Sequence, residues 1–361
     1  MSRSFDTKQL KDESLKKLYD YILHRATHIF EVFRDVYFPG SKNKELVIGY
    51  LHSTHFQAEA YRSKIDSFNI GIHSPTILLS RTLFDVLVTD DKYGGYITGE
   101  LSNNVTFPFR LINDVRNIYN QKEVLITKDS NRTLVSSVLT DLTGTFIALH
   151  EIGHIVLGHV DFTKAEFGDD QLLEIFSFKK RRLREAENRQ AMEHDADMIA
   201  ARLIPQYIEQ LHTKILEDNR YQLAFRKIHE SDRMLELLTA LSTSAIYAMF
   251  LYMFGPNTVR DFRYTAHHHP LTRIRNVVNG IVQTLSERWD FDLDLFDTFY
   301  EQMQISIQDI FAYNGMINSF LFKDSTPEKV KNDLARIQEL AFKNRSLSQP
   351  WSWLPKTEWI N

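Results

Sequence analysis

The sequence contains no cysteine, and this absence excludes a whole set of chemistries. Disulfide scaffolds, cysteine-ligated zinc sites, cysteine-ligated iron–sulfur clusters and thiol nucleophiles all need a residue that the chain lacks. Any metal ion must therefore be held mainly by His, Asp or Glu side chains.

Glycine and proline are scarce, with 13 and 9 of 361 residues, which excludes collagen-like and linker-rich architectures. Neither sign of charge dominates, because 43 basic residues face 47 acidic ones. This balance does not favour nucleic acid or an anionic membrane as the main partner. Hydrophobic residues at 43% and charged residues at 25% are typical of a globular protein.

The first 18 residues contain no apolar segment of the kind that secretory signal peptides carry, so we expect a cytoplasmic protein. One uncharged run, 237–259, is long enough to cross a membrane. Its apolar part, 245–254, is short for a span and follows several hydroxyl residues. We therefore favour a buried core helix at 237–255 and no membrane partner. A membrane-bound enzyme that uses this run as a span is the alternative.

Apolar spacing predicts an α+β fold that is predominantly helical. The expected N-terminal elements are a helix over 6–37, strands near 46–48 and 68–72, and a helix from Ser74. Almost all of the chain after residue 135 is expected to be helical, with loops at 161–172 and 255–269. We divide the chain into a mixed N-terminal part (1–134) that gates or recognises substrate, a helical catalytic core (135–285) and a helical C-terminal region with a Trp/Pro tail (286–361).

The chemistry is carried by an HExxH motif within a strong helical pattern. On a helix, His150 and His154 lie on one face, so both imidazoles can reach one zinc ion at ~2.0–2.1 Å. Glu151 lies beside them, where it can take a proton from a metal-bound water. The apolar flanks predict a buried helix, in which two histidines and a glutamate without a function would be costly.

A zinc hydrolase needs a third protein ligand, and three residues are candidates. Glu193 lies in an Ala-rich helical pattern, and Asp197 follows on the same face, where it can accept the free ring N–H of a ligating histidine. His159 is out of register with the metzincin pattern and would point away from the zinc face of a continuous helix. His194 projects about 100° away from Glu193. We favour Glu193 and keep the two histidines as alternatives.

HEIGH followed by a Glu-x-x-x-Asp helix resembles the gluzincin zinc metallopeptidases, especially the group that includes the CaaX prenyl proteases. Those families also carry a downstream His-Pro motif followed by Arg, and the segment 267–274 is similar, with a shorter gap between Pro270 and Arg273. Among such proteins, this chain most resembles the phage-exclusion peptidases of the Lit type. The resemblance covers about 135–280 and implies a zincin-like core around the HExxH helix.

The resemblance also implies roles for residues of the three motifs. It makes Glu151 the general base and Asp197 a partner of the ligands. One zinc ion per chain would be held by His150, His154 and Glu193.

Downstream, the resemblance places His269 near the site, where it orients substrate or stabilises the oxyanion. His267 or His268 is an alternative for this role. Arg273 would brace the Glu193 helix or the histidine loop.

These features predict a zinc-dependent endopeptidase that acts on a specific intracellular protein. The resemblance adds a translation factor as a candidate substrate and a role in phage defence. We also include an activating protein or peptide among the candidate partners. The alternative is a regulatory or sensor protein whose zinc is structural or whose activity is confined to one partner.

Three further segments favour structural interpretations. The basic run 179–184 is expected to be a solvated loop or helix start, and 52–55 a polar turn rather than a nucleophile and base. The tail 349–355 is expected to dock on the body of the protein.

Overall fold

The structure is a computed structural model, and some segments lie outside its described residues. The described residues are 4–37, 44–53, 56–91, 93–101, 127–168, 171–173, 182–254, 262, 265, 267, 269–316 and 326–354.

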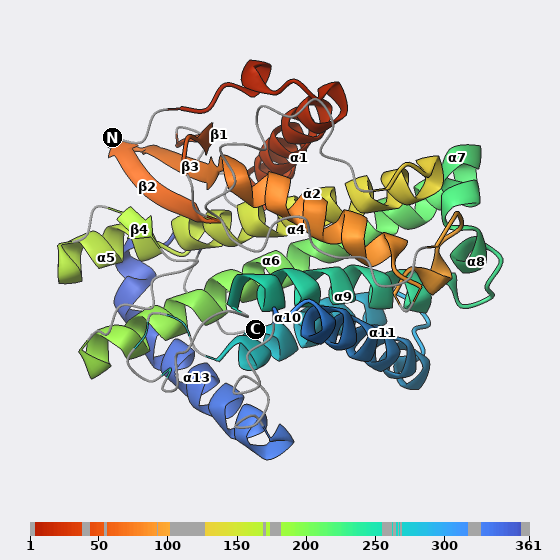
Figure 1. The fold of residues 1–361 in the computed structure, drawn as a ribbon. Coiled ribbons are helices and arrows are strands. Elements are labelled where there is room, and N and C mark those ends of the chain that lie inside the picture. The colour runs from red at the N-terminus through yellow and green to blue at the C-terminus, as the bar shows by residue number, and fades with distance from the viewer. Residues whose placement is uncertain are drawn as a thin grey trace.

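The N-terminal region forms a small sheet with two long helices beside it (Figure 1). The strand order is β1-β3-β2-β4, with β1 parallel to β3 and with β2 antiparallel to both β3 and β4. The elements are α1 (Glu13–Tyr37), β1 (Glu45–Leu51), β2 (Ala58–Lys64), β3 (Ser67–His73), α2 (Ser74–Thr89) and β4 (Gln171–Leu173).

The predictions for this region are confirmed in large part. The strands near 46–48 and 68–72 and the helix from Ser74 are present, while the first helix begins at Glu13 rather than at residue 6. Strand β2 was not expected, because its sequence AEAYRSK has little intrinsic strand preference. Pairing with two neighbouring strands decides its conformation.

The rest of the described chain is almost entirely helical, which confirms a predominantly helical α+β fold. Its helices are α4 (Ser130–Val156), α5 (His159–Phe167), α6 (Leu183–Glu217), α7 (Asn219–Ala224), α8 (Arg226–His229), α9 (Met234–Phe254), α10 (Pro270–Ser286), α11 (Leu293–Tyr313) and α13 (Pro327–Ser348). Short 3₁₀ turns occupy Thr7–Gln9, Gly94–Tyr96 and Gln349–Trp351.

The prediction of a loop at 161–172 is wrong over most of that segment. Gly158 adopts a left-handed conformation with φ of 74° and ends the HExxH helix, and α5 starts directly after it. The end of the segment, 171–173, is strand β4. Most of the second predicted loop, 255–269, lies outside the described residues.

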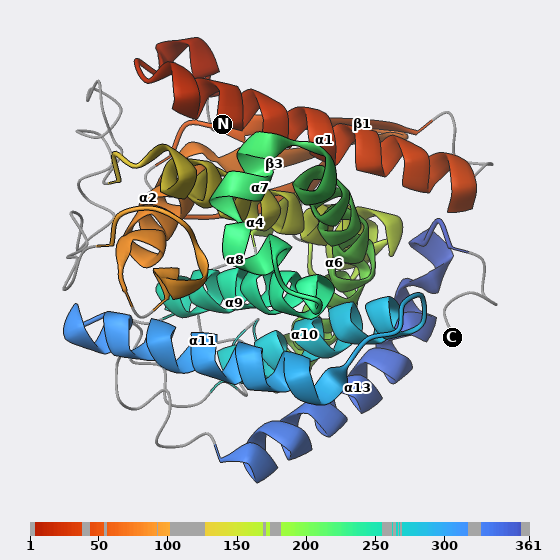
Figure 2. The same ribbon diagram turned by 90° about the vertical axis from the view of Figure 1, so that its right-hand side faces the viewer.

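Helix α4 lies at the centre of the molecule, and most of its residues are buried. Asp129 caps its first turn by accepting hydrogen bonds from the backbone N–H groups of Asn131 and Arg132. Helices α1 and α2 pack on one side of α4, and α6 and α9 pack on the other (Figures 1 and 2). Because neighbours surround it, α4 is apolar around its circumference rather than along one stripe.

Helix α9 is long and apolar enough to cross a membrane over Met234–Met253. Every residue of the tested part is buried inside the protein, where α9 packs against α4, α6, α10 and α11. We therefore interpret α9 as a core helix, as the sequence predicts. Residue 255 lies outside the described residues.

The tail after α13 docks on the body of the protein, as expected. The backbone N–H of Trp353 donates to the carbonyl oxygen of Val156 at 2.9 Å. Its ring packs against Phe30 and Phe68, with centroids 6.1 and 5.5 Å away. Residue 355 lies outside the described part of the chain.

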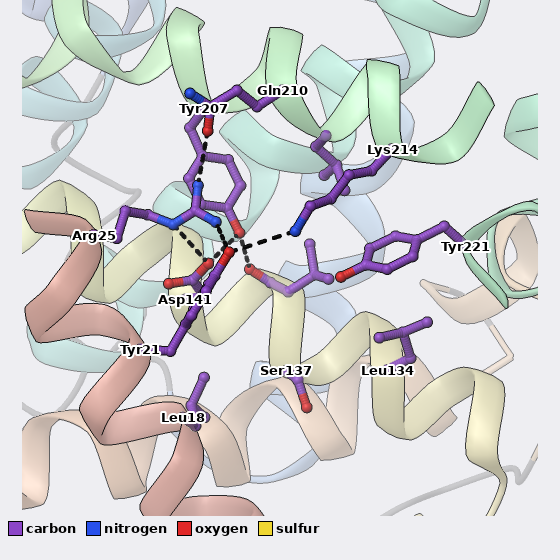
Figure 3. Close-up of a pocket in the computed structure, with 12 residues that line it drawn as sticks. Leu18, Tyr21, Arg25, Leu134, Ser137, Asp141, Tyr207, Gln210, Lys214 and Tyr221 are labelled. Atoms are coloured by element: carbon purple, nitrogen blue, oxygen red, sulfur yellow. Dashed lines mark hydrogen bonds and ion pairs between the residues drawn. The ribbon is translucent and has the colours of Figure 1, made fainter. Parts of the chain in front are cut away.

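A buried polar group joins α1, α4 and α6 beside a cavity of about 130 Å³ (Figure 3). Arg25 Nε lies 3.3 Å from Asp141 Oδ2, and the hydroxyl of Tyr207 donates to the same oxygen at 2.8 Å. The Arg25 guanidinium also lies 4.4 Å from the centre of the Tyr207 ring. Burial raises the pKa of Asp141 to about 6, although Arg25 and Tyr207 act to lower it.

This raised pKa predicts how Asp141 affects stability between pH 4 and 7. The folded protein keeps the Asp141 proton up to about pH 6, whereas an unfolded chain releases it near pH ~3.9. The contribution of Asp141 to stability therefore falls as pH rises through this window. The free energy of unfolding of Asp141→Asn, minus that of the wild type, should increase by up to about 3 kcal/mol from pH 4 to 7.

Urea denaturation of both proteins at several pH values measures this difference. A difference that stays constant, or that decreases with pH, would contradict the raised pKa.

Candidate metal centre

Two histidines from one turn of α4 form the first half of the centre. His150 and His154 are four residues apart, and their Nε2 atoms lie 3.1 Å from each other. Both side chains are buried, with exposed fractions of 2% and 0%. The predicted HExxH face is therefore present on a buried helix.

Glu193 of α6 completes the group. Its Oε1 lies 3.2 Å from His154 Nε2, and its Oε2 lies 3.6 Å from His150 Nε2. One ligand atom from each of the three residues lies within 4.8 Å of the others, so this buried group can hold a metal ion. The two helices thus bring together the residues that the sequence predicts as ligands.

Small residues allow α4 and α6 to approach this closely. A Cβ placed on Gly153 would lie 3.0 Å from the Ala196 Cα and 3.2 Å from the Ala196 carbonyl oxygen. Gly153 precedes His154, and Ala196 lies between Glu193 and Asp197 in the sequence of α6. The helices are therefore in close contact beside the predicted ligands.

Asp197 and Arg273 contact the candidate ligands at atoms that do not face the metal position. Asp197 Oδ1 lies 2.9 Å from His150 Nδ1, the ring nitrogen away from the Glu193 carboxylate. Arg273 donates to both carboxylate oxygens of Asp197, through Nε at 2.8 Å and Nη2 at 2.7 Å. Its Nη1 also lies 3.0 Å from Glu193 Oε2. The structure therefore brings both residues together with His150 and Glu193, while their roles beside a metal ion stay predictions.

The charges in this layer compensate one another. Burial by itself would raise the pKa of Asp197, but the Arg273 charge and the contact with His150 hold it well below its ordinary range. The same carboxylate, together with Glu193, raises the pKa of His150 against the effect of burial. Arg273 is only 2% exposed and its guanidinium lies 5.0 Å from the centre of the Phe250 ring.

His159 contacts the Nδ1 side of His154 and is not one of the three candidate ligands. Its Nδ1 is 3.0 Å from His154 Nδ1. Burial lowers the pKa of His154 to about 4 and that of His159 to about 3, so both rings are neutral at pH 7. One of the two Nδ1 atoms must donate to the other. When His154 donates, its Nε2 lone pair faces the metal position, so His159 can orient a ligand.

His267, the alternative to His269, is the downstream histidine that contacts the group. The Nδ1 atom of His267 lies 3.0 Å from Glu193 Oε2 and 3.2 Å from Arg273 Nη1, and its side chain is fully buried. His269 instead caps α10, where its Nδ1 accepts a hydrogen bond from the Leu271 N–H at 3.2 Å. His268 lies outside the described residues.

The sequence contains a signal for the role of His269. It directly precedes Pro270, and proline at the first position of a helix marks the preceding residue as the cap. No comparable pattern identifies His267, because it lies outside the predicted helices.

His194 lies on another face of α6, away from the other two histidines. Its Nδ1 is 3.3 Å from Asp195 Oδ1, and Asp195 is paired with Arg345 of α13 at 2.8 Å. The hydrogen bond from His194 and the Arg345 charge lower the pKa of Asp195 to about 2, against the effect of burial. Among the described residues, the group that can hold a metal contains Glu193 and neither His194 nor His159.

Glu151 is the least compensated polar group of the centre. Its carboxyl is fully buried, and neither oxygen has a hydrogen-bond partner among the described residues. Burial raises its pKa to about 8, with Glu193 and Glu59 raising it further and His150 lowering it. A charged carboxyl without a donor is costly to bury, which agrees with a pKa raised by burial.

Among the described residues of the other two segments, neither Arg184 nor His52 belongs to the group that can hold a metal. Arg184 is exposed and lies 3.5 Å from Glu166, whereas 179–181 lie outside the described residues. His52 is exposed and stacks on Phe5 with ring centroids 6.2 Å apart, and 54–55 are not described.

Comparison of the chain with protein-family models, with curated proteins and with solved structures gave no match. The assignment of the centre therefore rests on its motifs and geometry.

The contact at Gly153 predicts the effect of adding one methyl group. Alanine favours helices over glycine by roughly 1 kcal/mol, but overpacking a tight contact costs about 1–3 kcal/mol. Because the contacted atoms belong to the α6 backbone, we expect Gly153→Ala to lower the free energy of unfolding by about 1 kcal/mol. Gly49→Ala is the control, since nothing lies within 4 Å of its added Cβ. A Gly153→Ala protein as stable as the wild type would contradict this packing.

Arg273 is predicted to be essential to folding in the absence of metal. Arg273→Leu leaves the Glu193 and Asp197 carboxylates buried beside each other without their shared cation. Breaking a buried ion pair in this way costs about 3–5 kcal/mol. Denaturation of metal-free protein measures the loss, and Arg275→Leu, an exposed position on the same helix, is the matched control. Equal losses for the two variants would show that the Arg273 charge is not needed.

Proposed function

We propose that this protein is a zinc-dependent endopeptidase with a zincin-like core. The observation that carries the proposal is the convergence of His150, His154 and Glu193 on one point, with the unpartnered carboxyl of Glu151 beside them. Two imidazoles and one carboxylate are the protein ligands of a common class of catalytic zinc site. The donor set therefore fits one zinc ion per chain.

The fit is better for a catalytic ion than for a structural one. Structural zinc sites are closed by four protein ligands, whereas catalytic sites use three and keep one position open. The group supplies three ligands from the described residues. An uncompensated carboxyl next to a structural ion would cost stability without giving any function.

A zinc ion held by His150, His154 and Glu193 would supply Lewis-acid activation of the scissile carbonyl and of water. In its charged form, which a neighbouring cation favours, Glu151 would take the proton of the attacking water and pass it to the leaving amine. Asp197 and His159 hold the rings of His150 and His154 in orientation from their Nδ1 sides. His267 and Arg273 both contact Glu193, so they hold its carboxylate and lie where a developing negative charge can be stabilised.

The burial of the centre bears on the substrate. The three ligand side chains are at most 2% exposed, which favours a restrained enzyme over a general peptidase. From the resemblance to the Lit-type peptidases, we propose a specific intracellular protein as substrate, with a translation factor as the first candidate. The same resemblance suggests phage defence, and we further propose a cytoplasmic location and an activating protein or peptide.

The burial of the centre also agrees with a second candidate function. A regulatory or sensor protein, with structural zinc or with activity confined to one partner, would equally have a closed centre. The two candidates differ in whether Glu151 is needed for turnover.

Two isosteric variants test the proposal. Glu193→Gln should lose most of its zinc, because the carboxylate ligand is replaced by a neutral amide. Glu151→Gln should keep one zinc per chain and lose hydrolysis by roughly 10²–10⁴-fold, because the proton acceptor is removed. Elemental analysis measures zinc, and cleavage of a fluorogenic peptide library, with and without added translation factors, measures turnover.

Glu166→Gln is the control, because Glu166 is exposed on α5. Full activity in Glu151→Gln would contradict the mechanism. Folded wild-type protein that takes up no zinc would contradict the enzyme proposal itself.

A further inference from the structure

The cavity beside the buried pair of Arg25 and Asp141 combines an apolar interior with a positive charge. Its volume is about 130 Å³, close to the ~150 Å³ of an apolar cavity that holds one benzene molecule. It lies between α1, α4, α6 and α7 (Figure 3). None of its lining residues belongs to the group that can hold a metal, so the cavity is separate from the candidate metal centre.

Aliphatic side chains from three helices form the floor of the cavity. Leu18, Val138 and Leu211 are buried, and Leu134 is half-buried. Such a surface favours contact with an apolar group over contact with water. The small volume limits this group to about the size of one ring.

Two tyrosine rings line the cavity from opposite sides. Figure 3 shows Tyr21 of α1 on one side and Tyr221 of α7 on the other. Aromatic rings attract one another when their centres are about 4.5–7 Å apart, in stacked or edge-to-face arrangements. An aromatic ring on the floor can therefore contact both tyrosines, which favours it over an aliphatic group.

Lys214 supplies a positive charge at the rim. Its Nζ lies 3.4 Å from the Tyr21 hydroxyl, and 5.8 and 5.5 Å from the centres of the Tyr21 and Tyr221 rings. Arg25, the other cation of the lining, lies 3.3 Å from the Asp141 carboxylate. No ion pair of the described residues includes Lys214, so the lining carries one positive charge in excess.

The hydrogen bonds open to a ligand lie at the same rim. An ammonium group has three donor hydrogens, of which Lys214 uses one on the Tyr21 hydroxyl. The Tyr221 hydroxyl points inward beside it (Figure 3). A carboxylate accepts hydrogen bonds from both kinds of group, and hydrogen bonds between charged partners are about twice as strong as neutral ones.

We propose that this cavity binds a small aromatic carboxylate of about the size of benzoate. The ring packs on the aliphatic floor between Tyr21 and Tyr221, and the carboxylate accepts hydrogen bonds from Lys214 and from the Tyr221 hydroxyl.

Benzoate is the probe, because it combines one ring with one carboxylate. Ligand-observed NMR titration of the full-length, metal-free protein should show saturable binding, with a dissociation constant on the order of 1 mM for a ligand of this size. Lys214→Met keeps most of the side-chain length and removes the charge, so it should weaken binding at least about tenfold.

Two analogues separate the contributions of the ring and the charge. Acetate lacks the ring, and benzyl alcohol lacks the charge. Each should bind at least about tenfold more weakly than benzoate. Acetate that binds as tightly as benzoate would overturn the proposal, because the floor and the tyrosines would then contribute nothing.

Lys331→Met is the matched control, because it makes the same change at an exposed position of α13, outside the lining. It should bind benzoate like the wild type. Absence of saturable binding, or equal affinity in the wild type and in Lys214→Met, would show that this cavity is not the site.

A second readout follows from the four helices that contribute to the lining. A ligand that binds only the folded protein stabilises it. About 10 mM benzoate should therefore raise the equilibrium constant for folding about tenfold in the wild type and in Lys331→Met, and less than about twofold in Lys214→Met. Urea denaturation measures this constant. Equal stabilisation of all three proteins would contradict the proposed contact with Lys214.

Discussion

The close approach of α4 to α6 at Gly153 and Ala196 is the constraint on which the centre depends. The histidines come from one helix and Glu193 and Asp197 from the other, so the group exists only where the two backbones nearly touch. No side chain larger than hydrogen fits at Gly153 without moving α6. The packing of α1, α2 and α9 around α4 then holds this crossing in the middle of the molecule, where water is excluded (Figure 1).

Because water is excluded, each buried charge costs free energy unless a nearby group of opposite charge compensates it. Glu151, Glu193 and Asp197 are three carboxyl groups in one buried region, and Arg273 is the cation that contacts two of them. Glu151 receives no such compensation from the described residues. A divalent cation held by the two histidines and Glu193 would supply the missing positive charge. The buried group of His150, His154 and Glu193 can therefore hold a metal ion, and such an ion would also favour the charged form of Glu151 beside it.

The sequence is most informative about the centre where its residues lie at a fixed spacing along one helix. His150, His154, Glu193 and Asp197 lie on regular helices, so a spacing of four residues places each pair on one face. Their meeting across two helices could only be proposed, because it depends on the packing at Gly153.

Features outside regular helices were harder to predict. His267 and His159 reach the centre from an irregular segment and from a new helix that begins after a left-handed glycine, and neither follows a periodic pattern. Strand β2 and helix α5 were missed for a related reason, since tertiary pairing and one glycine decide them rather than local preference.

The most direct test of the central claim is X-ray absorption spectroscopy of the zinc-loaded wild-type protein. The account predicts one zinc per chain with four nitrogen or oxygen neighbours at ~2.0–2.2 Å, and outer scattering from two imidazole rings. A zinc environment with one imidazole or none, or six oxygen neighbours, would contradict a centre built from His150, His154 and Glu193.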